Sequence, residues 1–112
     1  MKDHSSHVVK SHEVIGVKVK NKEKEELGKV EEIVLEKISG QARYVVLSFG
    51  GLLGMGDKYF AFPWKSISYS PAEECFILDV DKNKLKEERG FDKDNWPDMA
   101  QWSETVDAYY NG

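Results

Sequence analysis

The chain has 112 residues, a mass of 12.8 kDa and 40% apolar residues, enough for one domain with its own hydrophobic core. Its longest apolar stretch is far shorter than the roughly 20 residues that cross a bilayer, so we expect no membrane-spanning helix. Lys and Arg total 16 against 20 Asp and Glu, and the net charge of −4 argues against general attraction to nucleic acid. The chain start lacks the apolar run of a signal peptide, and the single cysteine, Cys75, cannot form an internal disulfide. We therefore expect a cytoplasmic protein.

Residues 1–12 are mostly polar, and we expect them to form a flexible tail ahead of one domain over residues 13–112. Three histidines in this segment could ligate a transition metal: His4, His7 and His12. The segment has no framework that would hold them in fixed geometry. We therefore expect neither a metal site nor a cofactor.

Alternating apolar and polar residues predict short strands from residue 15 onward. The first covers residues 15–19, and a charged turn over 21–26 leads to a second strand. In residues 30–36, Val30, Ile33 and Val34 would also suit a helical face, but the β-branched residues favour a strand. The pair Glu31-Glu32 interrupts the alternation there, as at a β-bulge. The third strand, 44–49, has apolar residues at both parities, which indicates burial of both faces.

Two further strands, 59–62 and 64–69, are separated by Pro63, which cannot donate a ladder hydrogen bond and so marks a bend or an edge. A turn with Pro71 at its first central position then leads to a last strand over 75–80. Six short strands, with connections too short for a crossover helix, predict a mainly β fold, either a small barrel or a sandwich.

The end of the chain predicts helical and turn structure. Asp81 could cap a short helical turn through Leu85. Asp98 precedes apolar residues at steps of three and four, which predicts a C-terminal helix packed on the barrel: Met99, Trp102, Val106 and Tyr109.

Between these helical segments, Asp92 is a candidate turn former, and Trp96-Pro97 is a candidate rigid apolar peg. Asp92, Asp94 and Asp98 also match part of the spacing of a calcium loop. Pro97 and Ser103 stand where that loop needs Gly and Glu, so we favour a structural role.

The segment 50–56 is rich in glycine and is a candidate site. It lacks the Lys, the Ser or Thr and the following helix of a phosphate-binding loop, so its glycines more simply allow positive φ between two strands: Gly50, Gly51, Gly54 and Gly56. Three large apolar side chains here would be costly to leave in water: Leu52, Leu53 and Met55. Either this loop folds over one end of the barrel, or it contacts a partner protein or a second copy.

We expect no catalytic site. All three histidines lie in the first 12 residues, so no Cys-His or Ser-His-Asp arrangement with Cys75 is indicated, and no pair of carboxylates shows a sign of burial. Ile77, together with Cys75, gives the second face of the last strand apolar character. Ile77 is therefore a further candidate contact residue.

Three stretches resemble stand-alone PRC-barrel proteins. They are Arg43 to Gly51, then Gly54 to Lys58 followed by Pro63-Trp64, and Gly90 to Met99, which includes Phe-Asp-Lys-Asp-Asn-Trp-Pro. The resemblance extends over residues 11–110 and is weaker in the first two strands, where Gly28-Lys29-Val30 stands out. Phe62 departs from the pattern, because a smaller aliphatic residue is expected before Pro63-Trp64.

The resemblance implies a six-stranded, SH3-like barrel, related to the cytoplasmic domain of the photosynthetic reaction-centre H subunit and to the C-terminal domain of a ribosome-maturation factor. Both of these act as docking surfaces, single-domain members are prokaryotic, and the family has no catalytic residue to carry over. We therefore expect a non-enzymatic adaptor that binds a protein partner and forms a homodimer. The alternative is an RNA- or ribosome-associated protein. For that role the chain offers one interrupted basic cluster: Lys82, Lys84, Lys86 and Arg89.

Overall fold

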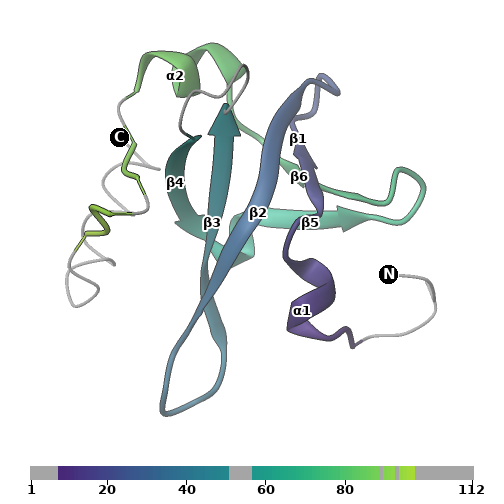
Figure 1. The fold of residues 1–112 in the computed structure, drawn as a ribbon. Helices are drawn as coiled ribbons and strands as arrows, with labels where there is room; N and C mark the ends of the chain where they lie inside the picture. The colour runs from purple at the N-terminus through teal and green to yellow at the C-terminus, as the bar shows by residue number, and fades with distance from the viewer. Residues whose placement is uncertain (1–7, 51–56, 89, 93, 98–112) are drawn as a thin grey trace.

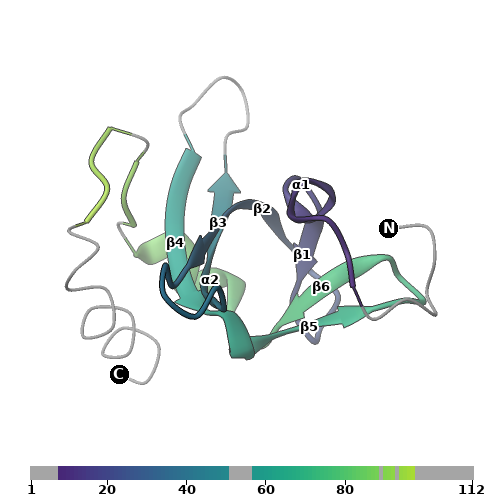
Figure 2. The ribbon, with the colours of Figure 1, turned by 90° about the horizontal axis from the view of Figure 1, so that it is seen from below.

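The computed structural model describes residues 8–50, 57–88, 90–92 and 94–97. These residues form a six-stranded sheet that curves into a half-barrel (Figures 1 and 2), which confirms the predicted mainly β fold. The strands are β1 Lys18–Lys20, β2 Glu26–Leu35, β3 Ala42–Gly50, β4 Asp57–Pro63, β5 Ile67–Ser70 and β6 Cys75–Leu78. Two short helices, α1 Ser11–Val14 and α2 Lys82–Glu87, flank the sheet in the chain.

The strand order is β4-β3-β2-β1-β6-β5. Neighbouring strands are antiparallel except for β1 and β6, which pair in parallel through Val19 with Phe76 and Lys20 with Ile77. This long-range pairing makes the sheet mixed. It also leaves β4 and β5, which are consecutive in the chain, as the two edges of the sheet.

The first strand is shorter than predicted. It begins at Lys18, whereas the alternation of the sequence suggested residues 15–19. Gly16 has φ +90, and its N–H donates to the Val30 carbonyl at 2.8 Å. This left-handed turn takes residues 11–15 out of the sheet, so Ile15 is exposed while Val14 of α1 is buried.

The predictions for β2 and β3 are confirmed. The β2–β3 register shifts between Val30 and Glu32, so Glu31 is the extra residue of a bulge, as the Glu31-Glu32 pair indicated. Consecutive residues of β3 are buried on both faces of the sheet: Tyr44, Val45, Val46 and Leu47. Because both faces of β3 are buried, its odd and even positions are both apolar.

Pro63 ends β4, and the 3-10 helix η2 (Trp64–Ser66) follows it. The predicted strand 64–69 is therefore wrong over its first half, because β5 begins only at Ile67. Trp64 packs on the core, where its ring centroid lies 6.3 Å from that of Phe76. The bend at Pro63 carries the chain from one edge of the sheet to the other.

The main core lies on the concave side of the sheet and takes in residues from both helices. Val14 of α1 and Leu85 of α2 are both buried within it. The strands contribute the rest of its buried side chains: Val19, Leu27, Val30, Val45, Leu47, Phe49, Phe60, Phe62, Phe76 and Leu78. Phe62, which departs from the family pattern, is therefore a core residue.

Helix α2 begins as the sequence predicts and is docked through its C-terminal end. The Asp81 carboxylate accepts a hydrogen bond from Asn83 N–H at 2.9 Å. The Lys58 ammonium donates to the carbonyls of Lys86 and Glu88, both at 2.9 Å, where a helix accumulates partial negative charge. The helix predicted after Asp98 lies outside the described residues, as does Arg89 of the basic cluster.

Candidate functional site

The β2–β3 hairpin projects from the half-barrel (Figure 1). Strand β1 pairs with β2 only between Glu26 and Lys29, and β4 pairs with β3 only from Tyr44 onward. The far end of the hairpin, residues 35–43, therefore has no neighbouring strand within the described part of the chain. We call residues 35–43 the hairpin tip.

Two large apolar side chains at the hairpin tip are exposed. The exposed fraction is 57% for Leu35 and 95% for Ile38, the highest value among the large apolar side chains described. Burial of an isoleucine side chain contributes roughly 1.5–3 kcal/mol of stabilising free energy, and a fully solvated isoleucine does not gain it. The tip is therefore a candidate contact surface, and burial of Ile38 against a partner would recover that free energy.

Polar contacts fix the conformation of the tip. Glu36 N–H donates to the Gln41 carbonyl and Gly40 N–H donates to the Glu36 carbonyl, each at 2.8 Å. Across the hairpin, Arg43 Nη1 lies 2.6 Å from Glu36 Oε2. A second register shift, between Val34 and Leu35, makes Arg43 the extra residue of β3. Ile38 thus sits on an ordered turn.

Glu36 is the acidic residue of the hairpin tip. A hydrogen bond from the Ser39 side chain, followed by the hydrogen bond from Arg43, lowers the pKa of Glu36 below its ordinary value. Glu36 therefore stays ionised and paired with Arg43. This leaves Lys37 as the uncompensated charge beside Ile38 among the residues of the tip.

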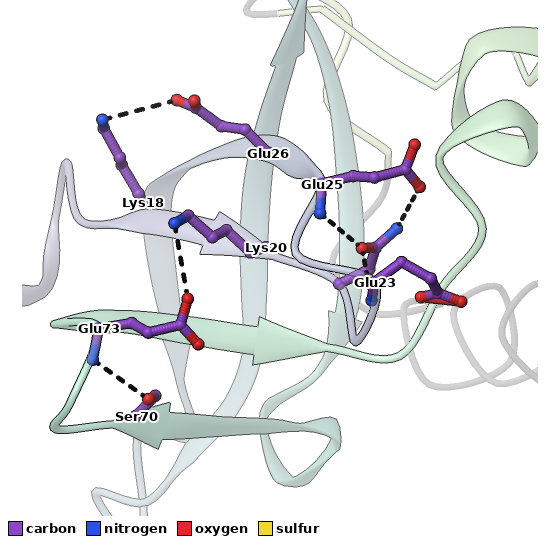
Figure 3. Close-up of polar contacts among 8 residues, drawn as sticks. Lys18, Lys20, Glu23, Glu25, Glu26, Ser70 and Glu73 are labelled. Carbon is purple, nitrogen blue, oxygen red and sulfur yellow. Dashed lines mark hydrogen bonds and ion pairs between the residues drawn. The ribbon is translucent and has the colours of Figure 1, made fainter.

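The two lysines of β1, Lys18 and Lys20, face carboxylates (Figure 3), and so does Lys22 in the turn that follows. The nearest nitrogen-to-oxygen distances are 3.9 Å for Lys18–Glu26, 3.7 Å for Lys20–Glu73 and 3.4 Å for Lys22–Asp79. Exposed pairs of this kind add little stability, but they cancel charge locally. The alternating lysines of this strand therefore form neutral pairs, and they do not form a basic stripe.

Asn21 is the one buried polar residue of the described chain, with 1% exposure. Its Oδ1 accepts from the N–H groups of Glu23 at 3.1 Å and Glu25 at 2.9 Å. Its Nδ2 donates to Glu25 Oε1 at 2.9 Å and to the Val80 carbonyl at 3.3 Å. Asn21 therefore ties the β1–β2 turn to the segment that follows β6, a structural role that its polar surroundings in the sequence did not indicate.

The segment that follows α2 covers the convex face of the sheet. Phe91 bridges to Tyr59 of β4 by two backbone hydrogen bonds of 2.7 and 2.9 Å. The Trp96 ring packs with the rings of Phe91 and Tyr59, at centroid distances of 5.1 and 6.0 Å. These residues complete a second apolar cluster around Tyr44 and Val46.

The candidate structural residues of this segment lie in that arrangement. One Asp92 oxygen accepts from Asp94 N–H at 2.9 Å and from Asn95 Nδ2 at 2.8 Å, while the other lies 3.0 Å from the same Asn95 nitrogen. Asp92 thus closes a turn. Trp96 and Pro97 follow it half-buried.

Of the predicted contact residues, only Ile77 lies within the described part of the chain. Leu52, Leu53 and Met55 lie outside the described residues, and so do Gly51, Gly54 and Gly56. Gly50 ends β3 with φ +95, opposite Asp57. Ile77 is half-buried on β6, between its register partners Lys20 and Ser68 on the neighbouring strands.

Among the described residues, no group of three or more His, Cys, Asp or Glu is placed to hold a metal ion, and no helix is long and apolar enough to cross a membrane. Cys75 is buried. Burial raises the pKa of its thiol, the charge of Glu73 adds to the effect, and Lys20 opposes it. The thiol is therefore in its protonated, unreactive form near neutral pH.

Sequence reasoning missed Leu35 and Ile38. A signal was present, because Ile38 directly precedes the turn residues Ser39-Gly40, where an apolar side chain has few neighbours to pack against. Whether such a residue is covered depends on how far the hairpin extends past the strands beside it. That depends in turn on the lengths of β1 and β4.

Comparisons with known proteins identify the family of the chain. A family model described as PRC-barrel domain matches residues 6–85. Among solved structures, the chain has a distant resemblance to a 16S ribosomal RNA processing protein, RimM, of Pseudomonas aeruginosa. Sequence identity is 15%, the TM-score is 0.49, and the match covers 74% of this chain and 50% of that one. The chain thus spans half the length of that protein. No curated protein matches the chain.

Proposed function

The chain belongs to the PRC-barrel domain family, and from this membership and the exposed hairpin tip we propose that it is a non-enzymatic module that binds proteins. The observation that carries the proposal is the 95% exposure of Ile38 on a turn ordered by the Glu36–Arg43 pair. A residue on an ordered turn binds a pocket without its backbone first losing much conformational entropy. The partner we expect is a protein with an apolar pocket that admits Ile38, and an acidic residue beside it for Lys37.

The proposal includes self-association and a cytoplasmic location. The thiol of Cys75 is buried, protonated and without a disulfide partner in the chain, which suits a reducing compartment. Self-association is expected because the sheet has open edges. Sedimentation at tens of micromolar, roughly the range in which weak interfaces assemble, measures it directly.

A protein is favoured over nucleic acid as the partner because several lysines are already paired within the chain. Lys18, Lys20 and Lys22 lie within 4 Å of carboxylates, and Lys58 is bound to the carbonyls at the end of α2. Strong binding to a phosphate backbone requires several unpaired cations on one surface. The ribosome-associated alternative would therefore depend on the basic cluster of Lys82, Lys84, Lys86 and Arg89, which Glu87 and Glu88 interrupt.

Affinity capture with matched variants tests the proposal. The whole chain is immobilised as wild type, as Ile38→Asp and as Ile15→Ser, an exposed apolar residue remote from the tip. We expect a host protein that is retained by the wild type and by Ile15→Ser and is lost with Ile38→Asp. If all three capture the same proteins, or if the retained material is RNA that nuclease removes, the proposal is wrong.

A further inference from the structure

Strand β5 is an open edge of the sheet. It pairs with β6 on one side, through four consecutive residues from Ile67 to Ser70. On its other side no described strand follows, and Figure 2 shows β5 at the outer border of the sheet. The opposite edge, β4, is partly covered because Tyr59 bridges to Phe91.

The composition of β5 suits pairing with another strand. Exposed edges are usually protected by charged residues, prolines or bulges, which discourage association. The sequence of β5, Ile67-Ser68-Tyr69-Ser70, has none of these. Ile67 and Tyr69 pack against the core, while Ser68 is exposed. A second strand could therefore approach without burying a charge.

The charges beside β5 favour a second copy of this chain as that strand. Lys65, exposed, lies two residues before the start of β5, and Glu74, exposed, lies in the turn that follows β5, next to Glu73, which is paired with Lys20. In an antiparallel pair of two β5 strands, the start of each strand lies beside the end of the other. Lys65 of each copy would then lie near the acidic turn of the other, and this attraction occurs twice in a two-fold symmetric dimer.

We propose that β5 pairs with β5 of a second copy, antiparallel and around a two-fold axis, so that the two sheets become continuous. This inference rests on the self-association in the proposed function and names its surface. The pairing joins at most four residues a side, so the interface is small and the dimer dissociates readily. This pairing stops at a dimer, because the β5 edge of each copy is occupied by the β5 edge of the other.

Sedimentation velocity over a concentration series tests the surface. Ser68→Lys puts one lysine from each copy at the centre of the pair, while Asn83→Lys adds the same charge at an exposed position of α2. The like-charge contact between the two lysines should weaken dimerisation about tenfold in Ser68→Lys. Asn83→Lys should associate as the wild type does. Equal dissociation constants for all three proteins would overturn the β5 assignment.

A charge swap tests the orientation. Lys65→Glu and Glu74→Lys should each weaken association, and the double variant should restore it, because the two charges exchange places across the axis. If the double variant is as weak as the worse single variant, antiparallel pairing is wrong. Circular dichroism spectra of each variant verify that the fold is intact.

Failure of this inference is distinguishable from failure of the proposed function. If Ser68→Lys dimerises normally, the β5 surface is wrong and self-association stands. If the wild type is a monomer up to about 300 µM, both self-association and the β5 pairing are wrong. The capture experiment with Ile38→Asp is unaffected by either result, since it depends on the hairpin tip.

Discussion

The backbone of Gly28 on β2 lies against the carbonyl group of Ser48 on β3. A Cβ atom at position 28 would overlap the Ser48 carbonyl oxygen and lie 2.9 Å from its carbonyl carbon. Gly28 also has φ +153, a conformation that other residues rarely adopt. This contact lies within the longest hairpin of the fold, the one that carries the candidate binding tip.

Gly28→Ala should therefore destabilise the protein strongly, by about 2–4 kcal/mol, because a methyl group must displace the backbone of β3. Gly40→Ala is the matched control, since Gly40 has φ +77 but open space around its Cβ position. It should cost only about 1 kcal/mol of backbone strain. Urea unfolding measures both, and equal losses would show that the close approach of Gly28 to Ser48 does not matter.

How much the sequence could predict depends on the range of the interactions. The bulge at Glu31 and the double burial of β3 follow from local alternation, and both were predicted. The parallel pairing of β1 with β6 joins residues far apart in the chain and has no local signature. Pro63 indicated a bend or an edge at the end of β4, which is an edge strand, but no local pattern identified β5 as the other edge.

The errors have local causes. The alternation that suggested a strand at residue 15 is interrupted by the left-handed conformation of Gly16, and a single sequence does not show which φ a glycine adopts. Asn21 was assigned to a solvated turn because its neighbours are charged, yet it is buried and fully hydrogen-bonded. Exposure of Ile38 depends on how far the hairpin projects, which no local pattern records.

Asn21→Ala should lower the free energy of unfolding by about 2 kcal/mol. The substitution removes four side-chain hydrogen bonds and leaves the N–H groups of Glu23 and Glu25 without their acceptor. Lys22→Ala, on the exposed neighbour, should change stability by less than about 0.5 kcal/mol. Thermal unfolding of the two variants checks this. A loss no larger than that of Lys22→Ala would contradict the role assigned to Asn21.

Glu74→Gly should stabilise the protein by up to about 1 kcal/mol. Glu74 has φ +52 in the turn between β5 and β6, and glycine adopts this conformation without steric cost. Glu73→Gly, one residue earlier, should instead destabilise, because it removes the Lys20 contact and adds freedom to the unfolded chain. Denaturant midpoints compare the two. We expect the midpoint to rise for Glu74→Gly and to fall for Glu73→Gly, and shifts of the same sign would contradict the role of the Glu74 conformation.

Stability should fall at alkaline pH, in part through Cys75. Because burial raises the pKa of the folded thiol, its contribution is complete below the pKa of the unfolded thiol, about 8.5, and is lost as the pH rises above it. Burial, with Glu74 and Cys75, also raises the pKa of Tyr69, which acts in the same direction.

Cys75→Ala removes the thiol and keeps Tyr69. The variant should be less stable than the wild type near neutral pH because it leaves a cavity, and the gap in unfolding free energy should narrow above pH ~8.5. Urea unfolding across that range measures the gap, and a constant gap would contradict the linkage. A thiol reagent should modify the wild type only after unfolding.

Photo-crosslinking from position 38 tests the central claim most directly. The whole chain carries a benzophenone amino acid in place of Ile38, or in place of Lys24 in the exposed turn at the other end of β2, and is irradiated in its native host. The account predicts a protein adduct of discrete mass from position 38 that position 24 does not give. The absence of any adduct at position 38, or one that ribonuclease removes, would contradict it.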